Sequence, residues 1–143
     1  MKARILLIIP VLVFAGACDE TIMIDSPLVG TWREVGQYRC GSGEEIVPLD
    51  PILELVFEDD GTFSVTWLPF EYYKDYWGNF SLNPDQSTLN LSISYGNFVP
   101  GDFDGVGFYS IDTQGNLILN DLWLGKKEQN LETHCGHRFA PAR

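Results

Sequence analysis

The histidines and cysteines near the C-terminus are the side chains whose types and spacing could do chemistry. His134, Cys135 and His137 lie within four residues, and Cys40 is a fourth donor of the kind that zinc takes. Because side chains alternate between the two faces of a strand, an extended chain would point His134 and His137 to opposite faces. We therefore expect partly exposed strand residues here, with neither a shared metal ion nor a catalytic base.

Other catalytic patterns are missing from the sequence. There is no Gly-x-Ser-x-Gly elbow, no phosphate-binding or dinucleotide-binding glycine pattern and no His-Glu-x-x-His pair. Asp102 and Asp104 have the oxygen-rich spacing of calcium ligands, but the full EF-hand loop is absent, so a solvated turn is expected there. We predict that the protein is not an enzyme and takes no cofactor or metal.

The first seventeen residues have the pattern of an export signal. Basic residues precede an apolar run over 5–14, which is too short to span a membrane but fits the core of a signal peptide. The run ends in Ala-Gly-Ala directly before Cys18, which resembles the bacterial lipobox; an ordinary secretion signal is the alternative. We expect residues 1–17 to be removed, Cys18 to be acylated, and residues 18–28 to tether the protein to the inner or outer membrane of the bacterial envelope.

Assigning Cys18 to the lipid leaves an even pair of cysteines in an oxidising compartment. A disulfide between Cys40 and Cys135 is the expected state of that pair. A closed loop of about 95 residues corresponds to roughly 4–5 kcal/mol of stabilisation in the chain-entropy treatment.

The composition indicates one acidic globular domain. The chain has 143 residues, a formal charge of −11, and 45% hydrophobic and 20% charged residues. We expect no nucleic acid partner, because a phosphate backbone requires a basic face. Loss of Lys2 and Arg4 with the signal takes the formal charge to −13, which would steer a basic protein partner to the surface.

Segments with strand periodicity recur between turn signals, and no useful length of the mature chain has the period of a helix. The eight predicted strands span 31–40, 52–58, 62–68, 76–82, 88–94, 105–112, 116–124 and 133–139. Eight strands with mostly short connections favour an all-β, eight-stranded antiparallel up-and-down barrel over a two-sheet sandwich. Closure would place the end of the first strand, at Cys40, beside the start of the last, at Cys135.

Glu34 is the carboxylate that this arrangement makes noteworthy. It shares a face of the first predicted strand with Trp32 and Tyr38. If that face is inward, Glu34 is a buried carboxylate that needs a partner. We expect instead that it lies at a wet barrel mouth.

The entry to the first predicted strand resembles a known family. Gly30 and Trp32, within Leu-Val-Gly-Thr-Trp, match the Gly-x-Trp signature of lipocalins, and the fuller pattern is similar to bacterial lipocalin-like lipoproteins. The stretches 57–63 and 115–119 also resemble hairpins of those domains. The resemblance implies a calycin-type barrel domain over 29–143.

The resemblance also implies a structural role for the signature. Trp32 would plug one end of the barrel, and Gly30 would let the chain turn in beneath it. In lipocalins an arginine from near the C-terminus packs over this tryptophan, and Arg138 and Arg143 are the candidates here.

Two functions of different classes follow from such a barrel. The first is binding of a small hydrophobic ligand inside an eight-stranded barrel, which has just enough interior for side chains or one small molecule. The candidate lining and entrance residues are Phe63, Val65, Trp67, Tyr72, Tyr73, Trp77, Leu89, Leu91 and Ile93. The second is an acidic protein–protein interaction module, an inhibitor or assembly factor, and a filled interior would favour it.

Overall fold

The computed structural model describes residues 24–67, 74–125 and 134–142. Regular structure in these ranges consists of strands alone, so the all-β prediction is confirmed, and no helix there is long and apolar enough to cross a membrane. The strands are β1 (Gly30–Arg39), β2 (Glu45–Ile46), β3 (Glu54–Phe57), β4 (Thr62–Thr66), β5 (Tyr76–Asn83), β6 (Thr88–Gly96), β7 (Val106–Ile111), β8 (Leu117–Asn120) and β9 (His134–Pro141).

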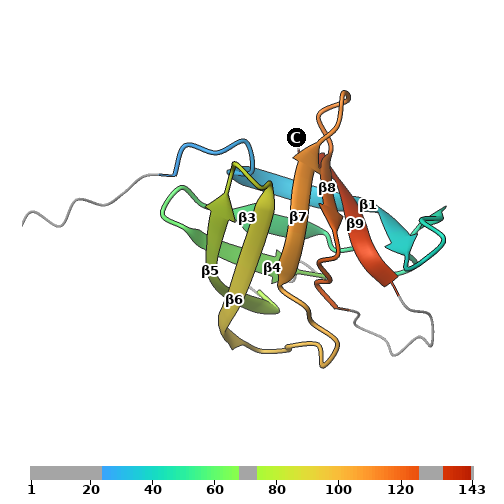
Figure 1. Cartoon of the computed structure of the whole chain (residues 1–143). Helices are drawn as coiled ribbons and strands as arrows, with labels where there is room; N and C mark the ends of the chain where they lie inside the picture. Colours follow the sequence, from blue (N-terminus) through green and yellow to red (C-terminus); the bar gives the residue numbers. More distant parts are fainter. Residues whose placement is uncertain (1–23, 68–73, 126–133, 143) are drawn as a thin grey trace, which may run out of the picture.

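The sheet closes into a barrel (Figure 1). Each strand from β3 to β9 pairs antiparallel with the next one in the chain, and β1 pairs with both β3 and β9. The seam between β1 and β9 runs from Trp32 opposite Pro141 to Arg39 opposite His134. The predicted eight-stranded up-and-down barrel is therefore confirmed, and the sandwich alternative is excluded.

Most strand boundaries differ from the prediction by one or two residues, and two differences are larger. The end of β1 folds back as the short strand β2, because Gly41 and Gly43 adopt the positive φ angles that a tight turn requires. The second difference is the end of β8, which stops at Asn120, whereas the predicted strand continued to residue 124. Asp121 has a φ of 53°, which ends the strand and turns the following residues inward over the core.

The two ends of the barrel differ in their connections. Short hairpins at 58–61, 84–87 and 112–116 join strands at one end, called here the hairpin end. The strand ends joined by longer connections lie at the opposite end, called the loop end. The chain enters at the hairpin end, where the Ile24 amide donates to the Asp59 carbonyl at 2.7 Å.

Hydrophobic side chains fill the barrel between the two ends. Phe57 contacts Phe63 and Phe80 at ring centroid separations of 6.4 and 4.9 Å, and Tyr76 lies 6.2 Å from Phe63 and 5.9 Å from Trp67. All five of these rings are buried. The interior is thus a packed aromatic and aliphatic core.

Candidate functional site

A buried polar network lies inside the barrel toward the loop end, and Glu34 is at its centre. The Glu34 side chain points inward from β1 and is 3% exposed, so the expected position at a wet mouth is wrong. Its carboxylate accepts hydrogen bonds from Gln37 Nε2 at 3.0 Å and from the Ile52 amide at 2.7 Å. These donors replace the water that burial removes.

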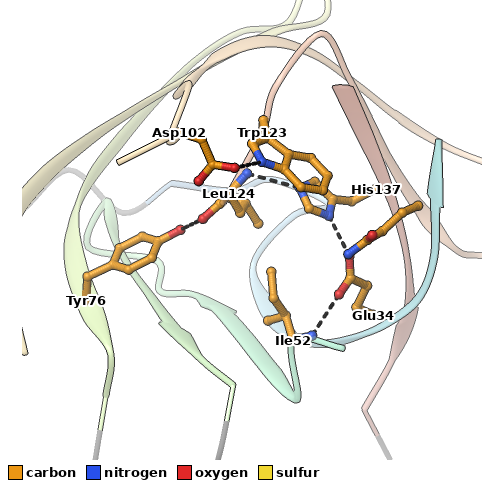
Figure 2. Close-up of polar contacts among 8 residues, drawn as sticks. Glu34, Ile52, Tyr76, Asp102, Trp123, Leu124 and His137 are labelled. Atoms are coloured by element: carbon orange, nitrogen blue, oxygen red, sulfur yellow. Dashed lines mark hydrogen bonds and ion pairs between the residues drawn. The ribbon is translucent and has the colours of Figure 1, made fainter. Parts of the chain in front are cut away.

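His137 is the third partner of Glu34, and its geometry assigns the tautomer (Figure 2). Nε2 accepts a hydrogen bond from the Leu124 amide at 3.0 Å, so that nitrogen carries no proton. Nδ1 lies 2.6 Å from Glu34 Oε1 and donates to it. The imidazole is fully buried, and both of its nitrogens are engaged.

Trp123 covers the imidazoles. Its ring stacks on His137 at 4.2 Å and 10° and on His134 at 5.4 Å and 18°. Both histidines are buried, so the expectation of partly exposed residues on opposite faces is wrong. The reason is a β-bulge: Tyr38 pairs with Gly136 and Arg39 with His134, which leaves Cys135 as an extra residue.

A second hydrogen-bonded branch holds the segment that carries Trp123. Tyr76 donates its hydroxyl to the Leu124 carbonyl at 2.6 Å, and Trp123 Nε1 donates to Asp102 Oδ2 at 2.9 Å (Figure 2). Burial raises the pKa of the Tyr76 hydroxyl well above its ordinary value, and the nearby charges of Asp102, Asp75 and Glu34 act in the same direction. Tyr76 is therefore a neutral donor at physiological pH.

This network closes the barrel and exposes no reactive atom of His137. A catalytic imidazole needs a free nitrogen within reach of substrate, whereas Nε2 is bonded to Leu124 and Trp123 covers the ring. Within the described ranges, no group of three or more His, Cys, Asp and Glu side chains is placed to hold a metal ion. The contacts of His137 with Glu34 and Leu124 thus link β1, β9 and residues 121–125 in the folded chain.

The predicted disulfide is present at the seam between β1 and β9. Cys40 and Cys135 are bonded, with their Cα atoms 5.3 Å apart. Cys135 is the extra residue of the bulge, so the crosslink lies directly beside the buried imidazoles. Cys18, the predicted lipidation site, lies outside the described residues.

The residues predicted to line a ligand cavity belong to the packed core. Phe63, Val65, Trp67, Leu89 and Leu91 are buried in one cluster, and Ile93 packs against it. Trp77 was expected at the entrance, but it faces outward and contacts Tyr95, with the ring centroids 5.0 Å apart and the rings tilted by 55°. Tyr72 and Tyr73 lie outside the described residues.

The barrel-end signature lies at the hairpin end. Trp32 is 6% exposed, and its Nε1 donates to the Leu28 carbonyl at 2.8 Å. Gly30 has a φ of 142°, a conformation that favours glycine. Arg138 binds Glu45 at 2.6 Å on the outside of the barrel, and Arg143 lies outside the described residues. The expected arginine over Trp32 therefore stays a prediction for Arg143.

The loop at 100–105 was expected to be a solvated turn, but its side chains and backbone bind other parts of the protein. Asp102 accepts from the Trp123 indole, and Asp104 accepts from the Val106 amide at 3.2 Å. The backbone of Asp104 also forms a bridge with Trp123. These contacts fasten the loop to the segment that closes the barrel.

Sequence reasoning missed Trp123, Tyr76, Gln37 and the role of Asp102. Trp123 lay within the predicted strand 116–124, and nothing in the sequence indicated the turn at Asp121 that places its ring on the two histidines. Comparisons with protein-family models, curated proteins and solved structures yield no match to this chain.

Proposed function

We propose that this protein is an exported, lipid-anchored, lipocalin-like binding protein of the bacterial cell envelope that acts through its outer surface and is not an enzyme. The observation that carries the proposal is the packed interior. Aromatic side chains occupy the space in which a barrel of this size would hold a ligand. Of the two functions that the sequence suggested, this favours the interaction module over the small-ligand carrier.

The charge of the protein indicates the kind of partner. The formal charge of −13 without the signal residues favours a basic protein, and long-range attraction would speed its approach. Glu54 and Glu58 are both exposed: Glu54 begins β3, and Glu58 follows its last residue and belongs to the acidic hairpin at 58–61. Because β1 carries Arg33 and Arg39, we assign the surface formed by β3 and the acidic hairpin at 58–61 as the face for this partner.

The entry of the chain suggests how the barrel is held. The backbone of Ile24 is hydrogen-bonded to the hairpin end, and five residues separate Ile24 from Cys18. The six residue steps from Cys18 to Ile24 span at most about 22 Å when extended. An acyl group on Cys18 would therefore keep the hairpin end next to the bilayer and leave the loop end facing away from it.

The test uses the Cys18→Ser form, which should move from the membrane to the soluble fraction without loss of the fold. This soluble protein is immobilised and exposed to envelope extract at low and high salt. We expect capture of a basic protein that high salt releases, and direct binding once that protein is purified. Unchanged membrane attachment of Cys18→Ser, or no salt-sensitive basic partner, would contradict the proposal.

A matched pair of variants locates the partner. Glu54→Gln with Glu58→Gln and Asn79→Lys with Asn90→Lys change the net charge by the same amount, on different sides of the barrel. Because exposed charges are screened beyond about 8 Å at physiological salt, the glutamate pair should weaken binding more than the asparagine pair. Equal effects would show that net charge alone, and not this face, governs the interaction.

A further inference from the structure

Charged residues are distributed unevenly around the barrel. One residue in five of the chain is charged, yet β4, β5, β6, β7 and β8 contain no Asp, Glu, Lys or Arg. The charged residues of the strands lie in β1, β2, β3 and β9. One continuous run of strands in an acidic protein therefore carries no charged residue, and the acidic residues nearest to it lie in the connecting turns and loops.

The side chains of these strands are of two kinds. Along β5, β6 and β7, which lie side by side in Figure 1, buried residues alternate with outward ones. The outward residues combine aromatic rings with amides and hydroxyls. We define the neutral face by six of them: Trp77, Asn79, Asn90, Ser92, Tyr95 and Phe108.

The aromatic residues stand at two positions along this face. Trp77 and Tyr95 form a cross-strand pair near the loop end, and Tyr95 is 63% exposed. Phe108 is 48% exposed and lies opposite Thr88, seven residues from Tyr95 along β6. At about 3.4 Å per residue, the two positions are roughly 24 Å apart. Amide and hydroxyl groups, including the pair of Asn79 and Ser94, lie between them.

We propose that the neutral face binds a neutral polysaccharide. Sugar rings present C–H faces that pack on aromatic rings, and their hydroxyl groups exchange hydrogen bonds with amide and hydroxyl side chains. An extended sugar polymer matches a strip with aromatic contacts at both ends and polar contacts between them. The charge of the protein favours a neutral polysaccharide over an anionic one. The strands of the neutral face contain no Lys or Arg to form ion pairs with an anionic polymer, and the acidic remainder of the protein would repel such a polymer.

This inference is independent of the basic protein partner, which is assigned to a separate surface at β3 and the hairpin at 58–61. A barrel with both sites would hold a protein and a glycan strand at the same membrane-anchored position. Substitutions in the neutral face should therefore leave capture of the basic partner unchanged.

The experiment measures retardation of the soluble Cys18→Ser protein in native gels that contain β-glucan or galactomannan, and its co-sedimentation with insoluble chitin. Anionic polygalacturonate is the control polymer. We expect binding to at least one neutral polymer, no binding to polygalacturonate, and no loss of binding at high salt. Tyr95→Ala and Phe108→Ala should each weaken binding about three- to tenfold.

Leu49→Ala is the matched variant, because Leu49 is 96% exposed and lies outside the neutral face. It should bind the polymer as the parent protein does. The proposal is overturned if no neutral polymer binds, or if Leu49→Ala weakens binding as much as Tyr95→Ala. It is also overturned if sedimentation shows a dimer that Phe108→Ala dissolves while polymer binding is absent, since the occupant would then be a second copy of the chain.

Discussion

Glu34 carries a carboxylate into the barrel, where three donors take the place of water. These donors are Gln37, the Ile52 amide and His137, which come from three different parts of the chain. Such a group contributes specificity because a shift between β1 and β9 would separate the buried carboxylate from His137 and leave both side chains without this contact. We infer that Glu34 fixes the register of the seam.

Glu34→Gln tests this role of the carboxylate. The amide supplies one oxygen and one NH₂ group, so at least one of the three donors would face another donor. We expect a loss of about 1–3 kcal/mol in the free energy of unfolding, measured by urea denaturation. Glu54→Gln is the exposed control and should change stability by less than about 0.5 kcal/mol. An equal effect of the two substitutions would contradict the role of Glu34.

Ionisation of Tyr76 should lower the free energy of unfolding at alkaline pH. Its pKa is raised in the folded protein by burial, so the unfolded chain releases this proton at lower pH than the folded one. The stability that Tyr76 contributes is complete below pH of about 10 and is lost as the pH rises toward the folded-state pKa, by up to about 1.4 kcal/mol per pH unit.

Tyr76→Phe removes both the titration and the hydrogen bond to Leu124. The variant should be less stable by about 0.5–1.5 kcal/mol at neutral pH, and its stability should fall less steeply above pH of about 10. Urea denaturation of both proteins across this pH range gives the comparison. Parallel curves would show that Tyr76 does not titrate differently on folding.

At the scale of strands, the bulges decide which side chains enter the barrel. Val35 is an extra residue of β1, so Gln37 rather than Tyr38 faces inward, and Cys135 has the same effect on the two histidines. Strand positions and the disulfide were predictable, because alternation and cysteine parity are properties of the sequence. A bulge has no comparable residue pattern, and one inserted residue reverses every later face. The polar network was therefore not predictable.

The disulfide stabilises this seam by closing a long loop. Replacing Cys40 and Cys135 by Ser should lower the free energy of unfolding by about 2–5 kcal/mol, because the crosslink spans 95 residues of the unfolded chain. Intact-mass measurement before and after reduction reports the bond in the parent protein. Two free thiols in protein prepared under oxidising conditions would contradict the assignment.

Gly78 shows a packing limit inside the sheet. The bulge between Trp77 and Gly78 brings the backbone of Ser92 to the place where a Cβ atom of residue 78 would lie. Gly78→Ala should therefore lower the free energy of unfolding, measured by thermal or urea denaturation, by about 1–3 kcal/mol. Gly101→Ala is the control, because its Cβ would meet open space. Equal stability of the two variants would show that the backbone of β6 moves to accommodate the added methyl group without destabilising the protein.

For the whole molecule, the packed interior supports the proposal that partners bind to the outside of the barrel. The network under Trp123 closes the loop end, Trp32 closes the hairpin end, and an aromatic core fills the space between them. The outside is divided into a charged side around β1, β2 and β3 and a neutral side over β5, β6 and β7. We interpret this division as two surfaces for chemically different partners.

The most direct test of the central claim is a titration of the soluble Cys18→Ser protein with the apolar fluorophore N-phenyl-1-naphthylamine. Leu91→Ala is the positive control, because removing a buried side chain leaves a dry apolar cavity that takes small apolar molecules. A packed interior predicts no saturable fluorescence change in the parent protein and a gain of binding in Leu91→Ala. Saturable one-to-one binding by the parent protein, lowered by Trp67→Ala, would contradict the account and restore the small-ligand carrier.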